Sequence, residues 1–243
     1  MNVDRILIVG HRGAEALAPE NTWAAFRAGY EAGADLLELD VQLSRDGEAV
    51  VYHDFTLFRL GDPRWVRDLT WEELSRLDVG RRFGPHFAGE RIPRLAEVLR
   101  WARGRVALWV DLKHGFQDPD DDRLEMTALD LIAKADMAEQ VIISSWDQVA
   151  LARIHARRPD IPLAVNLRQR VADPVGAVRH TNARWIVVYW PHVDRPTVAR
   201  LQGAGFATCL VNLFTGDYRE ARRLGVDAVS ASDPGAARTT LYG

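Results

Sequence analysis

Residues 6–43, which read ILIVGHRGAEALAPENTWAAFRAGYEAGADLLELDVQL, contain one strand, one helix and a second strand. The apolar runs 6–9 and 36–43 have the length and composition of buried strands, and residues 21–32 repeat apolar positions at helical spacing. A strand, a crossover helix and a second strand in this order form a parallel βαβ unit. This unit sets the pattern for the rest of the chain.

Further units of the same kind follow to the end of the 243-residue chain. Apolar runs predict strands at 106–112, 141–144, 162–167, 185–189, 207–213 and 226–230, with helical segments between them, for example at 123–135, 148–156 and 218–224. About eight such units favour a closed (β/α)8 TIM barrel over an open doubly wound sheet. No Gly-x-Gly-x-x-Gly motif follows the first strand, which removes the usual support for a dinucleotide-binding fold. We therefore predict an α/β protein with a single domain over residues 1–243.

One segment breaks the alternation. Residues 50–53 follow the second strand too closely for a parallel crossover, and Asp46-Gly47 between them is a strong hairpin signal. With these as the two turn residues, His53 lies opposite Asp40, with Cβ atoms about 5 Å apart. Even if the register slips by one or two residues, the hairpin would carry His53 back to Glu38 and Asp40 of the second strand.

Residues 55–93 are richer in glycine, proline and arginine and lack a strand pattern. A capping box at 70–73 opens a predicted helix over 69–77, and another helix is predicted at 95–101. We predict that about 55–93 forms a small insertion after the second strand that lies over the barrel mouth. A long disordered loop is the alternative.

Composition excludes several classes of function. A net charge of -3 and a pI near 6.2 argue against a broad nucleic-acid footprint. Cys209 is the only cysteine, so neither an intramolecular disulfide nor a thiolate metal cage can form. No run approaches the length of a membrane span, and no leader pattern precedes the first strand, so we expect a cytoplasmic protein.

Three carboxylates are predicted to meet at one rim of the barrel. Glu38 and Asp40 alternate on one strand and therefore share a face. Buried together they are costly unless a cation pairs with them, and Arg12 or Lys113 could neutralise them. Asp111 ends another strand, which a barrel brings to the same rim. Three carboxylates suit a hard divalent cation, Mg2+ or Ca2+, and no histidine and cysteine set recommends zinc.

Two histidines are predicted beside these acids. His11 follows the first strand and His53 the hairpin, and two imidazoles with near-neutral pKa values can act as general acid and general base in one turnover. Arg12 offers a fixed planar charge for a phosphoryl oxygen, with a salt bridge to Glu20 as the alternative. Lys113 lies two residues beyond Asp111 and shares its face of the strand. It can therefore add a second positive charge beside that of Arg12.

Other polar and aromatic residues are predicted to be structural. Asn21 resembles the N-cap of the helix at 21–32. Trp146 and Trp190 follow strands and could line the mouth, while most tryptophans are expected to pack the core. We assign no role to His86, His155, His180 or His192.

The combined motifs resemble the glycerophosphodiester phosphodiesterase family. The matching stretches, in the family's order, are His11-Arg12-Gly13, Pro19-Glu20-Asn21-Thr22, Glu38-Leu39-Asp40-Val41, Asp46-Gly47, His53-Asp54, residues 87–93, and Gly225-Val226-Asp227 with Ser232-Asp233-Pro234. The match is weak between 114 and 205. The resemblance implies a (β/α)8 barrel that uses a divalent cation to hydrolyse a small glycerophosphodiester substrate to glycerol 3-phosphate and an alcohol.

The resemblance also implies residue roles. The family's two catalytic histidines and three metal ligands fall on His11, His53, Glu38, Asp40 and Asp111. The third ligand is usually glutamate in a Glu-x-Lys pattern, so Asp111 is a departure, whereas Lys113 is retained. Cys209 stands where the family usually has the tryptophan of Trp-Thr-Val-Asn, which changes the shape of the glycerol pocket.

Two other functions stay open at this point. One is a sphingomyelinase D or phospholipase D-like phosphodiesterase with the same barrel and histidine pair. The other is a barrel that binds phosphodiesters without turning them over, because the changed third ligand weakens the metal site. The sequence specifies neither the head group nor the oligomeric state.

Overall fold

The computed structural model describes residues 5–114, 121–211 and 216–243. Within these residues one sheet has the strand order β1-β9-β8-β7-β6-β5-β4-β2-β3, and a further pairing of β1 with β2 closes it into a barrel. The strands are β1 (Leu7–Gly10), β2 (Leu36–Leu43), β3 (Ala49–Val51), β4 (Ala107–Leu112), β5 (Val141–Ser145), β6 (Leu163–Leu167), β7 (Trp185–Tyr189), β8 (Ala207–Val211) and β9 (Ala228–Ala231). All barrel pairings are parallel, and β3 alone pairs antiparallel, with β2. The predicted (β/α)8 barrel is confirmed.

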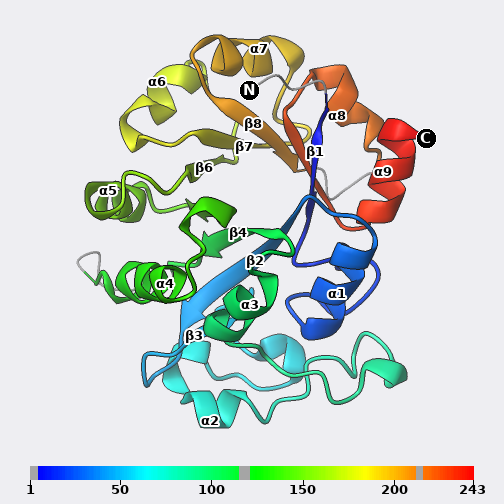
Figure 1. Cartoon of the computed structure of the whole chain (residues 1–243), viewed down its shortest axis with the longest axis vertical. Coiled ribbons are helices and arrows are strands. Elements are labelled where there is room, and N and C mark those ends of the chain that lie inside the picture. Colours follow the sequence, from blue (N-terminus) through cyan, green and yellow to red (C-terminus); the bar gives the residue numbers. More distant parts are fainter. Residues whose placement is uncertain (1–4, 115–120, 212–215) are drawn as a thin grey trace.

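Helices surround the barrel strands (Figure 1). They are α1 (Trp23–Glu31), α2 (Trp71–Leu74), α3 (Leu95–Ala102), α4 (Arg123–Lys134), α5 (Gln148–Arg157), α6 (Pro174–Val178), α7 (Arg195–Gly203), α8 (Arg219–Leu224) and α9 (Pro234–Tyr242). Single turns of 3-10 helix lie at Phe58–Leu60, Val66–Asp68, Pro85–Phe87, Ala138–Gln140 and Arg179–Thr181. Helix α2 is shorter than predicted, but its capping box between Thr70 and Glu73 is present.

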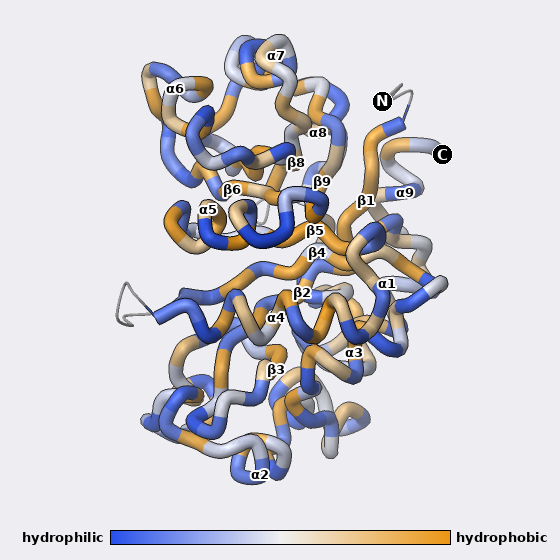
Figure 2. Tube along the Cα trace, turned by 60° about the vertical axis from the view of Figure 1, so that its left-hand side comes forward, coloured by the Kyte–Doolittle hydropathy of each residue, from blue (hydrophilic) through white to orange (hydrophobic). Residues whose placement is uncertain are grey.

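The two faces of each strand enter different apolar layers. On β2, Leu37 and Leu39 pack outward against the helices, whereas Leu36 packs inward against Val9 and Trp109 of neighbouring strands. The strands are correspondingly apolar along much of their length (Figure 2). The inward layer is apolar at the barrel floor, and β2 continues from Leu36 to carboxylates toward its end. This alternation places polar chemistry at one end of the barrel.

The hairpin between β2 and β3 has a three-residue turn. The backbone N–H of Ser44 donates to the carbonyl of Glu48 at 2.9 Å, which leaves residues 45–47 as the loop. Gly47 has φ +85°, the left-handed conformation that a glycine adopts readily in such a loop. The predicted two-residue turn is therefore wrong by one residue.

The longer turn changes the pairing of the two strands. Val41 pairs with Val51, and the N–H of Tyr52 donates to the carbonyl of Asp40 at 3.0 Å. Tyr52 therefore lies opposite Asp40, and the prediction that His53 does so is wrong. His53 lies one residue beyond Tyr52 and still lines the same cavity as Asp40.

Helix α1 begins later than predicted. Thr22 is its N-cap, because its side-chain oxygen accepts from the N–H of Ala25 at 3.3 Å. The prediction that Asn21 caps this helix is wrong. Asn21 instead has φ +58° and turns its side chain toward Asp40.

The segment between β3 and α3 folds around a small apolar cluster. Its buried members are Val50, Leu57, Val66, Leu69, Leu74 and Ile92. A short bridge joins Val50 of β3 to Arg94 at the end of the segment, and another joins Thr56 to Trp65 within it. Phe55, Thr56 and Trp65 of this segment line the cavity described next.

Candidate active site

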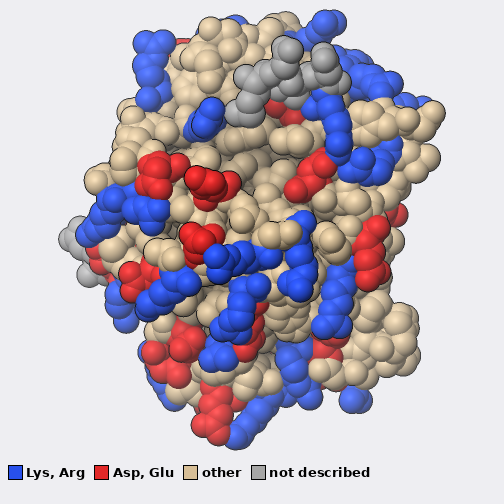
Figure 3. All heavy atoms as spheres, in the orientation of Figure 1, with Lys and Arg blue, Asp and Glu red and all other residues tan. Residues whose placement is uncertain are grey.

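A cavity of about 560 Å³ opens at the carboxyl ends of the barrel strands. All seven residues predicted for the site line it: His11, Arg12, Glu38, Asp40, His53, Asp111 and Lys113. Its floor is formed by inward residues of the barrel, namely Val9, Trp109, Val187, Cys209, Val211 and Ser230. On the face shown in Figure 3, acidic and basic side chains lie side by side rather than in one basic stripe.

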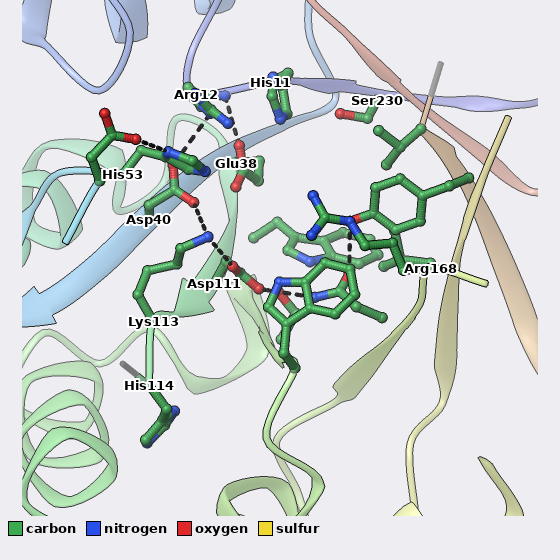
Figure 4. Close-up of a pocket in the computed structure, with 18 of the residues that line it drawn as sticks. His11, Arg12, Glu38, Asp40, His53, Asp111, Lys113, His114, Arg168 and Ser230 are labelled. Carbon is green, nitrogen blue, oxygen red and sulfur yellow. Dashed lines mark hydrogen bonds and ion pairs between the residues drawn. The ribbon is translucent and has the colours of Figure 1, made fainter. Parts of the chain in front are cut away.

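Strand register brings the carboxylates together. Asp40 and Asp111 are paired residues of the β2–β4 ladder and therefore share a face, on which Glu38 also lies. The ammonium of Lys113 stands between them, with Nζ 3.2 Å from Asp40 Oδ1 and 3.3 Å from Asp111 Oδ2 (Figure 4). Ser144 also donates to Asp111, at 2.6 Å.

Arg12 contacts three acidic residues through its backbone and its guanidinium. Its backbone N–H donates to Glu38 Oε2 at 2.7 Å, and its Nε lies 3.4 Å from Asp40 Oδ2. Its guanidinium also donates to Glu20 at 2.8 Å, so the salt bridge named as its alternative role is present as well. The Nε is buried and has no hydrogen-bond acceptor among the described residues, which leaves one donor for a ligand oxygen.

The carboxylates have opposed pKa shifts. Burial raises the pKa of Glu38 to about 8, and the charge of Asp40 adds to this. Burial alone would also raise the pKa of Asp40, but Lys113, His53 and Arg12 outweigh it and lower that pKa to about 2. Asp40 is therefore the anion of the pair, and Glu38, whose negative charge nearby cations compensate less, keeps its proton up to about pH 8.

Both histidines are held by carboxylates. His11 Nδ1 lies 2.7 Å from Glu15 Oε1, and Ser232 donates to the same carboxylate oxygen at 2.8 Å. His53 Nδ1 lies 2.7 Å from Asp54 Oδ1. With Nδ1 engaged in each ring, Nε2 is the nitrogen left for proton transfer. Figure 4 shows His11 and His53 on either side of Glu38, with Asp40 next to His53.

The surroundings of His11 favour its charged form. Burial would lower the pKa of His11, but the hydrogen bond to Glu15 and the charge of Glu38 outweigh it, so this pKa is raised. Glu15 is a supporting residue that sequence reasoning missed. It lies four residues after His11, and this spacing was its signal.

The three carboxylates fit a divalent cation by their chemistry. They supply the hard oxygen donors that Mg2+ and Ca2+ prefer, and they outnumber the two cations, Arg12 and Lys113, that face them. As placed, no three His, Cys, Asp or Glu side chains within 5–114, 121–211 and 216–243 form a ready metal-binding group. A bound cation would therefore compete with the Lys113 ammonium for Asp40 and Asp111.

Asn21 is a second residue whose part sequence reasoning missed. Its side-chain amide donates to Asp40 Oδ2 at 2.8 Å and accepts from the Asp40 N–H at 3.2 Å, and only 2% of the residue is exposed. This pair of bonds fixes the rotamer of Asp40. Both an N-cap and such a side-chain contact are typical uses of asparagine, so the local pattern did not distinguish them.

His114 is a third. It lines the cavity, and its two ring nitrogens lie 2.9 Å from Glu125 Oε2 and 3.2 Å from Ser145 Oγ. Glu125 is fully buried on α4 and also pairs with Arg153 at 3.4 Å. This network ties the end of β4, next to Lys113, to β5 and α4. The remaining histidines, His86, His155, His180 and His192, do not line the cavity, nor does Trp190.

Replacing His114 by glutamine should reduce stability in a pH-dependent way. Burial would lower the pKa of His114, but Glu125 outweighs it and raises this pKa above 6.5, so the stabilisation is complete below about pH 6.5 and is lost as pH rises through the folded-state pKa. Breaking such a buried pair typically costs about 3 kcal/mol. Urea unfolding should therefore show a larger difference between wild type and His114→Gln near pH 6 than near pH 9. A pH-independent difference would contradict the ion pair, and His155→Gln on α5 is the control.

The mouth of this TIM barrel gathers histidines, carboxylates and cationic side chains into one cavity at the carboxyl ends of the strands, the arrangement of the class of TIM-barrel enzymes. Within the part of the chain that the structure describes, no helix is long and apolar enough to cross a membrane.

Comparison with known proteins identifies the family. The model of the glycerophosphoryl diester phosphodiesterase family matches residues 11–236. The chain belongs to this family of enzymes, as the motifs indicated. YhdW of Bacillus subtilis is 38% identical over 162 residues, which cover 66% of this chain and 65% of that protein. The glycerophosphodiester phosphodiesterase of Caldanaerobacter subterraneus is 37% identical over 172 residues, or 70% of each chain. The matches thus span about two thirds of these curated relatives.

A solved structure agrees over almost the whole chain. The crystal structure of the glycerophosphodiester phosphodiesterase from Agrobacterium tumefaciens superposes with a TM-score of 0.79 at 29% identity. The match covers 97% of this chain and 100% of that one. The fold is therefore shared with a member of the family over almost the whole length compared.

Proposed function

We propose that this protein hydrolyses glycerophosphodiesters to glycerol 3-phosphate and an alcohol. The observation that carries the proposal is the placement of His11 and His53, each held by a carboxylate, in the wall of one cavity. Arg12 and Lys113 line the same cavity and supply fixed positive charge for a phosphoryl group.

The proposed chemistry needs one proton acceptor and one proton donor. One histidine removes a proton through Nε2 from the attacking hydroxyl, either water or the substrate's own glycerol hydroxyl. The other histidine protonates the departing alcohol oxygen as its bond to phosphorus breaks. Arg12 Nε and the Lys113 ammonium stabilise charge that grows on the phosphoryl oxygens. Glu15 and Asp54 keep each imidazole in the tautomer that its role requires.

Glu38, Asp40 and Asp111 are proposed to hold the divalent cation, Mg2+ or Ca2+. When bound, the cation supplies Lewis-acid charge to a non-bridging oxygen. Asp111 is one methylene shorter than the usual glutamate. Hydrogen bonds from Ser144 at 2.6 Å and Asn166 at 3.2 Å hold its Oδ1 in a defined place, which supports a role in spite of the shorter reach.

Three further expectations stay proposals. The chain would act as one domain, with the insertion at about 55–93 over the mouth contributing Phe55, Thr56 and Trp65 to the cavity. Its partner would be a small-molecule diester rather than a nucleic acid. A cytoplasmic location also stays a prediction.

The direct test is a panel of glycerophosphodiesters incubated with Mg2+, Ca2+ or Mn2+, with glycerol 3-phosphate as the measured product. Release of glycerol 3-phosphate that EDTA abolishes, and that one of these ions restores, is the expected result. Release of choline from lysophosphatidylcholine without turnover of glycerophosphocholine would instead favour a sphingomyelinase D-like enzyme. Tight binding without any turnover would favour a phosphodiester-binding barrel.

A further inference from the structure

A cation–aromatic cluster lies on the side of the cavity formed by β5, β6 and β7. The Arg168 guanidinium lies over the ring of Trp146, 4.9 Å from its centroid, and 5.9 Å from the centroid of Tyr189. The two rings are themselves 5.6 Å apart. Each of these residues ends or follows one of three adjacent strands, and all three line the cavity. The proposed chemistry uses none of them.

Arg168 differs from the other cations of the cavity in its charge balance. Lys113 is paired with Asp40 and Asp111, and Arg12 with Glu20 and Asp40. No carboxylate pairs with Arg168 among the residues that the structure describes. Its exposed guanidinium therefore adds positive charge that the cavity wall does not neutralise.

The cluster lies apart from the reacting groups. Figure 4 shows Arg168 across the cavity from His53, with the carboxylates and Lys113 on the His53 side. A phosphodiester held between the histidines would leave this side of the same cavity open to one of its two substituents. The guanidinium also covers the aromatic faces that a quaternary ammonium group would otherwise use, so this side is unsuited to a cationic head group.

We propose that Arg168, positioned by Trp146 and Tyr189, binds an anionic group on the leaving alcohol, a carboxylate or a second phosphate. The enzyme would then favour glycerophosphodiesters with an anionic head group over those with a cationic one. A guanidinium is suited to either anion because its N–H groups match their oxygens in pairs. This inference rests on the proposed function, since it names the substrates of the same site.

Glycerophosphoserine and glycerophosphoethanolamine make a matched pair of substrates, because they differ only by one carboxylate. We expect wild type to prefer the serine diester, and Arg168→Gln to lower the serine-to-ethanolamine ratio of kcat/KM about tenfold, the order of one charge-assisted hydrogen bond at an exposed position. Arg170→Gln is the control. Arg170 is another exposed arginine just after β6, but it pairs with Asp194 at 3.0 Å and does not line the cavity. This variant should keep the ratio.

Glycerophosphoinositol with and without a phosphate on the ring is a second pair of substrates. Comparing the preference in this pair with that in the first shows whether the site favours a phosphate or a carboxylate. A loss of preference in either pair on Arg168→Gln supports the proposal. Unchanged ratios in both pairs would overturn it, and so would an equal loss for all substrates, because Arg168 would then act on the shared phosphodiester.

Titration calorimetry of the same diesters with the His53→Ala variant separates this inference from the proposed function. If wild type hydrolyses none of them, the proposed function fails. The affinity ratio between the serine and ethanolamine diesters, with and without Arg168→Gln in this background, still decides whether the anion subsite exists. A ratio of one in both proteins would refute the subsite.

Discussion

Replacing His53 by alanine is expected to lower kcat by about 10²–10⁴-fold, the usual contribution of one general acid or base. The substitution removes the imidazole while Asp54 keeps its ion pair with Arg59 at 2.8 Å, so the surrounding loop retains a stabilising contact. His11→Ala should have an effect of the same order, because each proton transfer needs its own group. Initial rates of glycerol 3-phosphate release, at saturating substrate and metal, measure both.

The controls separate lost chemistry from lost structure. His155→Ala changes a histidine on α5 that does not line the cavity. Because this position is away from the site, kcat should stay within a factor of about two, and the free energy of unfolding should change by no more than about 0.5 kcal/mol. Circular dichroism and thermal unfolding should show both catalytic variants folded. A His53→Ala or His11→Ala protein that is folded and keeps more than about a tenth of wild-type kcat would exclude that residue as acid or base.

The strand pattern could be predicted because it depends on the local sequence. The predicted bounds of β2 and β7 match the structure. β7 is an uninterrupted apolar run, as is typical of buried parallel strands, and β2 keeps apolar residues on its outward face while carboxylates alternate on the other. The meeting of Asp111 with Glu38 and Asp40 followed from strand ends alone, because a closed barrel brings all of them to one rim. Nothing in that step required the exact pairing of the strands.

The predictions that were wrong or missing concern contacts between residues that are distant in the sequence. The loop of the β2–β3 hairpin has one residue more than the Asp46-Gly47 signal implies, and this shifted the partner of Asp40. The side chain of Asn21 reaches across to a strand 19 residues away, and His114 finds its buried partner 11 residues along the chain. Such pairings need the tertiary fold, because neither residue has a periodic pattern that marks its partner.

Replacing Asp40 by asparagine should lower kcat/KM about 10³-fold, the upper range for removal of one preorganised electrostatic group. Asparagine keeps the shape of the side chain but removes the charge that faces Lys113 at 3.2 Å and Arg12 at 3.4 Å. It also removes the neighbouring charge that helps to raise the pKa of Glu38 to about 8, so Glu38 becomes more readily ionised. The total negative charge of the cavity thus changes little. A loss of activity would therefore show that the charge is needed at the position of Asp40 itself.

Calorimetric titration of the same variant with Mg2+ or Ca2+ should show weaker binding than wild type, which tests Asp40 as a ligand independently of turnover. Asp35→Asn is the matched control at the other end of β2, where Asp35 accepts from the Ile8 N–H at 2.8 Å. Because that end of a barrel serves stability, this change should lower the unfolding temperature and spare kcat/KM. If Asp40→Asn bound the cation as tightly as wild type, Asp40 would be an ion-pair partner of Lys113 and not a metal ligand.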